Sequence, residues 1–181
     1  GRTYEGYSEN TQLVTELGRN FILGLQGIDK DFLDNDHVLA TAKHFIGDGG
    51  TDRGIDQGNT IVNEDTLKSV HGVPYYAAID SCALSVMATF NSWNGVKTHG
   101  NKYLLIDVLK SQMEFNGFIV GDWNGHGQIP GCEDANCPEA FNAGVDIYMV
   151  PQEWEPLYWN TLDQVRNGII TEERLDDAIT R

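Results

Sequence analysis

The sequence has little positive charge. Its 181 residues include 12 Lys and Arg against 27 Asp and Glu, a formal net charge of −15. Nucleic-acid binding depends on clustered Lys and Arg that displace counterions from phosphates, so nucleic acid is excluded as an expected partner. An anionic membrane surface is excluded on the same ground. Neutral ligands, sugars among them, are compatible with this charge.

Long apolar runs are also missing. No stretch approaches the roughly 18 apolar residues that a membrane-spanning helix needs. The chain opens on Gly1-Arg2-Thr3-Tyr4 without a Met or an apolar leader, so we expect a piece of a longer polypeptide. The 40% of apolar and 22% of charged residues are typical of one folded globular domain.

Cysteine is scarce, with three residues in the chain. Cys132 and Cys137 lie in a polar, turn-forming segment, and their short separation favours a disulfide, which would indicate an oxidising compartment. A zinc site is the alternative, although two thiolates do not fill four tetrahedral positions. Cys82 lies in an apolar run, so we expect a buried free thiol.

Helical and strand-like segments alternate along the chain. Apolar periodicity predicts helices over 9–26, 64–80, 104–113, 140–143, 154–165 and 172–180. We expect Pro74 to break or restart the second of these helices. Short apolar runs predict four buried strands, over 38–45, 85–90, 117–121 and 146–150.

Polar, glycine-rich segments follow these strands rather than precede them. Strands that alternate with helices form parallel βα units, so the segments meet at the carboxyl edge of the sheet, where (β/α) barrels have their active sites. Four strands make half a barrel, which has two open edges. We predict an α/β fold, either a small doubly wound sheet or, preferably, a partial TIM-like barrel of about four parallel βα units.

Two strand ends contain groups suited to binding. The first has Lys43 and His44, which can donate hydrogen bonds to hydroxyl oxygens; a rim lysine and a histidine bonded to the main chain are the alternative. The second has Met87, Phe90 and Trp93 next to amide side chains. An aromatic ring can cover the apolar face of a sugar while amides meet its hydroxyls, although core packing also explains these residues.

The third strand end is Gly121-Asp122-Trp123. A carboxylate directly after an apolar strand is poorly explained by folding, because it must lose water and find a partner. A helix N-cap or an ion pair with Lys43 would be a structural explanation, and a catalytic carboxylate is the functional one. Trp123 offers a ring that could form a pocket wall.

Four histidines raise the question of a metal site. None has the i, i+4 spacing of a helical site, and no Asp/Asn ladder matches a calcium loop. The residues concerned are His44, His71, His99 and His126. We expect no metal and no cofactor.

Six segments, spread from the first residue to nearly the last, resemble glycoside hydrolase family 3, the β-glucosidases and exo-β-glucanases. Their order and spacing fit as well as their residues. The resemblance implies the C-terminal part of the family's N-terminal (β/α) barrel domain. The segments are 1–5, 42–51, 90–97, 117–123, 144–151 and 174–178.

The family pattern implies a role for each catalytic-site residue that matches it. Asp122 resembles the nucleophile of a retaining, double-displacement mechanism, and a cation at Lys43 would favour its ionised form. Arg2, Lys43 and His44 match the clamp on the sugar at the non-reducing end. Trp123 matches one wall of the first subsite.

Further positions match the family less closely. Met87 and Phe90 fall where the family has additional lining residues, and Phe90 departs from the Tyr of some members. Gln128 stands where some members have Arg.

The resemblance also implies parts that this sequence does not contain. The family's barrel is longer on its N-terminal side, which supplies a substrate-binding Asp, and a second α/β sandwich domain supplies the acid/base Glu. The glutamates that fail to match that position are Glu5, Glu9, Glu64 and Glu133. We therefore expect residues 1–181 to be a barrel fragment, without the upstream barrel part and the downstream domain, and inactive alone.

The implied activity is hydrolysis of terminal non-reducing β-D-glucosyl residues from β-glucosides or β-glucans. The implied partners are such an oligosaccharide and the missing second domain, and the implied location is secreted or periplasmic. A non-catalytic carbohydrate-binding α/β domain is the alternative, and a metal-dependent hydrolase is a third hypothesis.

Overall fold

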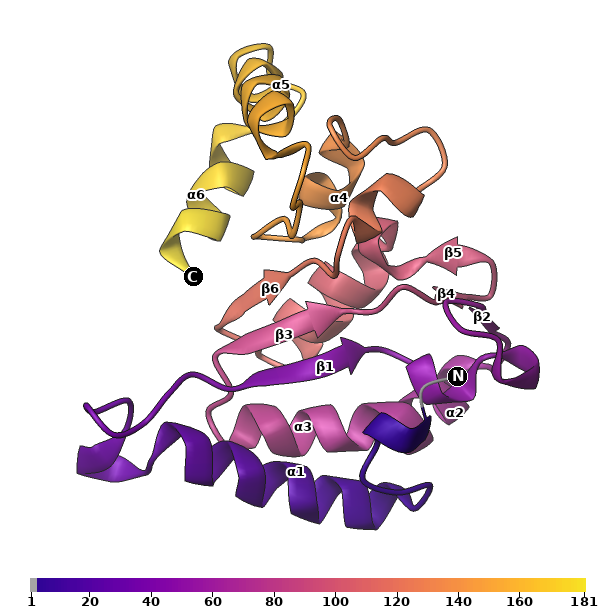
Figure 1. Ribbon diagram of the computed structural model, residues 1–181, viewed down its shortest axis with the longest axis vertical. Helices are drawn as coiled ribbons and strands as arrows, with labels where there is room; N and C mark the ends of the chain where they lie inside the picture. The colour runs from indigo at the N-terminus through magenta and orange to yellow at the C-terminus, as the bar shows by residue number, and fades with distance from the viewer. Residues whose placement is uncertain (1–2) are drawn as a thin grey trace.

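Three parallel strands run through the middle of the protein in the order β1-β3-β6 (Figure 1). A computed structural model describes residues 3–181, and the strands are β1 (Thr41–Phe45), β3 (Ser85–Ala88) and β6 (Phe118–Val120). Val86 pairs with Ala42 on one side and with Ile119 on the other. The mixed α/β architecture with a parallel sheet confirms the predicted class.

The fourth predicted strand, over 146–150, is wrong. This segment makes a single parallel bridge, between Val120 and Ile147. The reason lies in Asp146, whose Oδ2 accepts the main-chain N–H of Ile119 at 2.8 Å. A side chain thus occupies the position that the carbonyl of a regular strand would take.

A second small sheet was not expected from the sequence, which predicted loops there. It has the order β2-β4-β5 and consists of β2 (Asn59–Thr60), β4 (Ser92–Trp93) and β5 (Val96–Lys97). β2 follows β1 along the chain and β4 follows β3, so this sheet joins the two loops at the carboxyl edge of the large sheet (Figure 1).

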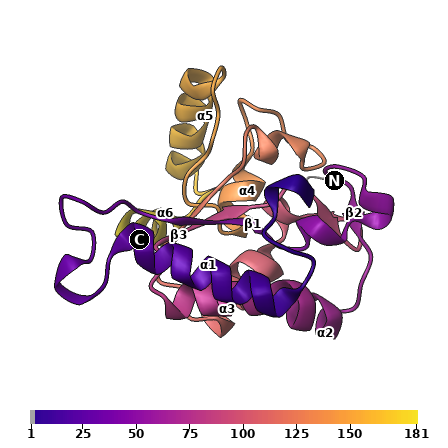
Figure 2. The ribbon, with the colours of Figure 1, turned by 60° about the horizontal axis from the view of Figure 1, so that its bottom comes forward.

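The first two predicted helices are present. α1 (Thr11–Gln26) begins after Asn10, whose Oδ1 accepts the N–H of Leu13 at 3.0 Å. The second consists of α2 (Glu64–Thr66), a π-helical turn (Leu67–Gly72) and α3 (Val73–Asp80). Pro74 lies in the first turn of α3, directly after the π-helical turn, so the helix changes its hydrogen-bonding pattern next to the residue that lacks an N–H. α1 and α3 lie side by side next to β1 (Figures 1 and 2).

The later helices lie on the β6 side of the sheet (Figure 1). They follow the predicted segments closely, with one difference: the helix over Tyr103–Gln112 is π-helical. The others are α4 (Pro138–Ala143), α5 (Trp154–Arg166) and α6 (Glu172–Thr180). No helix among residues 3–181 is long and apolar enough to cross a membrane.

The larger of two apolar clusters is built from the strands and the Tyr103–Gln112 helix, and the smaller one lies between α1 and α3. Members of the larger cluster include Phe45, Val86, Leu105, Leu109, Ile119 and Val145, all with no solvent exposure. Cys82 belongs to neither cluster, contrary to expectation. This residue follows α3 with a φ of 62°, and the turn directs its thiol to solvent.

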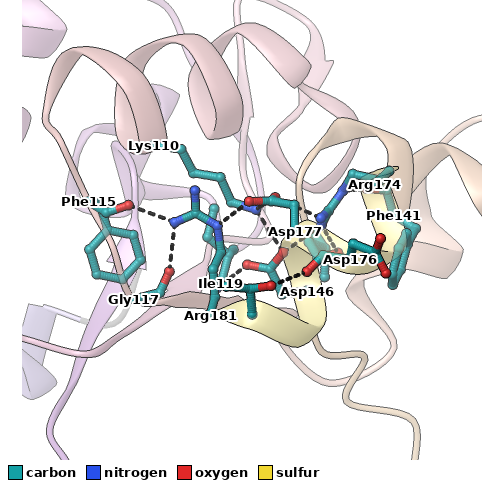
Figure 3. A network of polar contacts seen from close by, with 12 residues as sticks. Lys110, Phe115, Gly117, Ile119, Phe141, Asp146, Arg174, Asp176, Asp177 and Arg181 are labelled. Atoms are coloured by element: carbon teal, nitrogen blue, oxygen red, sulfur yellow. Dashed lines mark hydrogen bonds and ion pairs between the residues drawn. The ribbon is translucent and has the colours of Figure 1, made fainter. Parts of the chain in front are cut away.

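A network of charges attaches α6 to the amino end of β6 (Figure 3). Oδ1 of Asp146 accepts from Nζ of Lys110 at 2.7 Å and from the guanidinium of Arg174 at 2.5 Å. Arg181 donates to the carbonyls of Phe115 and Gly117, which directly precede the strand. Lys110 and Asp146 are almost fully buried, so the interactions replace water that both ions have lost.

Candidate active site

Asp122 follows β6 at the carboxyl edge of the sheet. Its main-chain N–H donates to Nε2 of His99 at 2.9 Å, and its Oδ1 accepts the N–H of Trp123 at 2.7 Å. Its Oδ2 is enclosed and has no hydrogen-bond partner among the described residues. The carboxylate is therefore held in orientation by one donor, while its second oxygen accepts no hydrogen bond and faces the imidazole of His44.

His44, at the end of β1, lies between two carboxylates. Its Nε2 is 3.6 Å from Oδ2 of Asp122, and its Nδ1 is 3.3 Å from Oδ2 of Asp48. Only 10% of the His44 side chain and 12% of the Asp122 side chain are exposed. The ends of β1 and β6, which flank β3, thus bring a histidine and an aspartate together as the sequence predicted.

Lys43 lies differently from the expectation. Its side chain is exposed, and no ion pair joins it to Asp122 in the part of the chain that the structure describes. An exposed ammonium keeps its hydration and needs no carboxylate partner. The ion pair proposed for Asp122 is therefore absent, and His44 is the group that approaches the carboxylate.

His99 is a site residue that sequence reasoning considered only as a metal ligand. It is buried, and burial lowers its pKa to about 3, with the neighbouring His126 contributing. A neutral imidazole has an acceptor nitrogen, as the bond from the N–H of Asp122 requires. A Cβ at position 125 would overlap the His99 ring. The glycine at this position is therefore the one sequence feature that is related to the buried place of His99.

The predicted lining residues surround this point with different exposures. Trp123 is 56% exposed, whereas Met87 and Phe90 are partly buried near the end of β3. The Phe90 ring lies 6.1 Å from the His99 ring, centroid to centroid. Arg2 lies outside the described residues.

Lys97 joins three loops at the same edge, a role that the sequence did not reveal. Its Nζ donates to the carbonyls of Phe90 and Gln57 at 2.8 and 3.3 Å, and to Oε1 of Gln128 at 2.9 Å. Gln128 in turn donates to Oε1 of Gln57 at 2.8 Å. Burial lowers the pKa of Lys97, and its bonds go to neutral oxygens.

Cys132 and Cys137 form the expected disulfide, with Cα atoms 4.8 Å apart. Together with Glu139 they also make a group of close metal-ligand residues. Sulfurs in a disulfide are not thiolates, so this pair does not supply the ligands of a zinc site.

A model of the glycosyl hydrolase family 3 N-terminal domain matches residues 1–181. The chain belongs to glycosyl hydrolase family 3. Among similar proteins, a β-xylosidase of Formosa agariphila is 42% identical over 157 residues, which are 83% of this chain and 22% of the relative. A periplasmic β-glucosidase of Salmonella typhimurium is 32% identical over 98% of this chain and 23% of its own length.

Solved structures of family 3 proteins share this fold. An exo-1,3/1,4-β-glucanase from a Pseudoalteromonas species superposes with a TM-score of 0.98 at 50% identity, over 100% of this chain and 23% of that one. The family 3 chain described here therefore spans less than a quarter of the length of these relatives.

Proposed function

We propose that Asp122 is the nucleophile of a retaining glycoside hydrolase that releases terminal non-reducing β-D-glucosyl residues from β-glucosides or β-glucans. The observation that supports this most directly is the Oδ2 of its largely buried carboxylate, which accepts no hydrogen bond and lies 3.6 Å from Nε2 of His44. Asp146 provides the contrast, because both of its oxygens are used by hydrogen bonds and ion pairs within the fold. A buried carboxylate with a purely structural role is expected to resemble Asp146.

The geometry suits a double displacement. A single main-chain N–H orients the carboxylate without neutralising it, which leaves electron density for attack on the anomeric carbon. Attack gives a covalent glycosyl-enzyme while a general acid protonates the departing oxygen; water then releases the sugar with overall retention.

The terminal sugar would be bound by groups at the same edge. In this proposal Arg2, Lys43 and His44 hydrogen-bond its hydroxyls. Lys43 supports the idea because its ammonium has no ion pair within residues 3–181, so its donors are available to a ligand. Trp123 presents an exposed ring next to Asp122 and would form one wall.

Met87 and Phe90 would line the pocket more deeply. Both are partly buried near the carboxyl end of β3, between the strands that provide His44 and Asp122. A partly exposed apolar surface at this position suits the C–H face of a sugar ring.

The chain would act as part of a longer protein. β1 is an edge strand of its sheet, and α1 presents Leu13, Leu17 and Phe21 half-exposed. Unpaired parallel strands and apolar helix faces are normally covered, which supports a larger (β/α) barrel. The acid/base Glu, expected about 5 Å from Asp122, would come from a second domain.

The names of the relatives bear on the substrate class, and the disulfide bears on the location. Relatives named β-glucosidase and β-xylosidase are both similar to this chain, so a glucoside and a xyloside must be compared. The Cys132–Cys137 disulfide fits an oxidising compartment, which supports a secreted or periplasmic protein.

The test uses the full-length protein and 4-nitrophenyl β-glucoside, with the β-xyloside as comparison. Asp122→Ala should lower kcat by about a millionfold, as loss of the nucleophile does in a serine protease. Azide should restore turnover of this variant and give the α-glycosyl azide, because it replaces the missing nucleophile. Asp163→Ala, at an exposed aspartate of α5, serves as the control and should leave kcat unchanged.

Two results would contradict the proposal. Activity that survives Asp122→Ala excludes this residue as nucleophile. A parent protein that binds β-glucans but hydrolyses neither aryl glycoside would instead indicate a non-catalytic carbohydrate-binding domain, and inactivation by chelation would indicate a metal-dependent hydrolase.

A further inference from the structure

The segment 132–137 is a hairpin that is closed twice. The Cys132–Cys137 disulfide closes it covalently. Inside the disulfide, Glu133 and Asn136 exchange two main-chain hydrogen bonds of 3.0 Å each. Asp134 and Ala135 form the tip, which therefore has little conformational freedom to lose.

The tip contacts the segment that directly follows Asp122 and Trp123. The main-chain carbonyl of Asp134 accepts from Nε2 of His126 at 2.8 Å. The side-chain Oδ2 of Asp134 accepts from Nδ2 of Asn124 at 2.8 Å. Oδ1 of Asp134 lies so close to Gly127 that a Cβ there would overlap it. One residue thus touches three positions of the segment 124–127.

That segment determines how the nucleophile is presented. Asn124 adopts the left-handed conformation with a φ of 52°, which is strained for most residues and tolerated by Asn. The N–H of Gly125 donates to the carbonyl of Asp122 at 2.9 Å. Asp122, Trp123 and Asn124 therefore share one turn, and a shift of Asn124 moves the Asp122 backbone with it.

The hairpin is braced from its other side. Nδ2 of Asn160, on α5, donates to the carbonyl of Ala135 at 2.8 Å, and Nε2 of Gln164 donates to Oδ1 of Asn136 at 2.6 Å. Tyr148 donates its hydroxyl proton to the carbonyl of Cys137 at 2.6 Å. The hairpin thus connects α5 to the turn after Asp122.

We propose that Asp134 is a positioning residue that fixes the turn after the nucleophile, and that the Cys132–Cys137 disulfide keeps it in place. This inference rests on the proposed function, since it assigns part of the Asp122 geometry to the hairpin. Binding of the sugar involves other groups, so loss of Asp134 affects the reaction step more than ground-state binding. A displacement of about 1 Å is enough to slow such a step up to a hundredfold.

The experiment compares Asp134→Ala with Asp134→Asn in the full-length protein. Asn keeps an oxygen that can accept from Asn124, whereas Ala removes it. We expect Asp134→Ala to lower kcat by about tenfold to a hundredfold with little change in KM, and Asp134→Asn to stay within a few-fold of the parent. Asp163→Ala is again the control. The double variant Cys132→Ser, Cys137→Ser, or reduction of the parent by a phosphine, should change kcat in the direction of Asp134→Ala.

Hydrogen exchange of the peptide covering 122–127 gives a second, activity-independent measure. Asp134→Ala should accelerate its exchange and Asp134→Asn should not. Parent-like kcat and parent-like exchange in Asp134→Ala would overturn the inference, and a parent-like kcat in the double cysteine variant would overturn the role assigned to the disulfide. If the parent hydrolyses no glycoside, the proposed function fails, and the exchange data alone then decide whether Asp134 fixes the turn.

Discussion

The main-chain N–H of Asp122 donates to Nε2 of His99, a residue of the 3-10 helix Thr98–Gly100 that follows β5. This bond needs an unprotonated nitrogen at His99, and burial lowers the pKa of that imidazole to about 3. The position of the proposed nucleophile therefore depends on the protonation state of a second residue.

The first prediction concerns stability at acid pH. The folded pKa of His99 is about 3 and the unfolded value about 6.5, so between these values the unfolded chain binds one more proton. The contribution of neutral His99 to the free energy of unfolding is fully present above pH 6.5. It is lost as the pH falls toward 3, by at most about 1.4 kcal/mol per pH unit. Hydrogen exchange of peptides covering β6, measured against pH, gives the local opening free energy.

His99→Gln is the matched variant for this measurement. Its amide oxygen can still accept from Asp122 but does not titrate, so the His99 contribution to the acid dependence should disappear. An unchanged pH slope in His99→Gln would show that other groups cause the acid sensitivity.

The second prediction concerns Gly125. A Cβ at this position would overlap Cε1 and Nε2 of the buried His99 ring. Gly125→Ala should therefore displace His99 and lower the melting temperature, since overpacking of a tight interior costs about 1–3 kcal/mol. Gly49→Ala is the matched control, because no atom lies within 4 Å of its Cβ and, like Gly125, it does not have the positive φ that strains a side chain. Equal melting temperatures for Gly125→Ala and the parent would refute the steric argument.

The third prediction concerns the charge network of Figure 3. Asp146→Ala leaves the main-chain N–H of Ile119 without its acceptor and removes the nearer of the two carboxylates that bind the buried ammonium of Lys110, the other being Asp177. Removing one partner of a buried pair costs about 3–5 kcal/mol. Chemical denaturation, with hydrogen exchange of β6 peptides as the readout, should show this loss of stability. Asp163→Ala breaks only an exposed 3.6 Å contact with Arg166, so its free energy of unfolding should stay close to that of the parent.

The fourth prediction concerns thiol chemistry. Cys82 is exposed and free, while Cys132 and Cys137 are joined. In these 181 residues an aromatic disulfide reagent should therefore titrate one thiol in the native state and three after denaturation and reduction. Peptide mapping assigns the label, and a native label on Cys132 would contradict the disulfide.

Local patterns explain which parts of the fold were predictable. The first three strands and the helices have apolar periodicity within the segment itself, and the structure reproduces them. The fourth strand was misassigned because the side chain of Asp146 replaces a main-chain partner of Ile119. The strands of the small sheet have two residues each, too few for any period to be visible.

The candidate site was predictable where a residue ends a strand. Asp122 and His44 follow that rule and lie together. His99 and Lys97 could not be found in this way, because their partners are distant in sequence and depend on how the loops fold. The exposure of Cys82 and Lys43 likewise depends on backbone direction, which apolar patterning does not encode.

The small sheet has a consequence for engineering this family 3 chain. β2 and β4 pair in parallel, and the N–H of Gly95 donates to Oδ1 of Asn59 at 2.8 Å. The loops after β1 and β3 are thus hydrogen-bonded to each other and depend on each other for their conformation, although they are separate stretches of sequence. A chimera that exchanges one of them with a relative would lose this pairing, so transplants intended to change substrate preference should move both loops together.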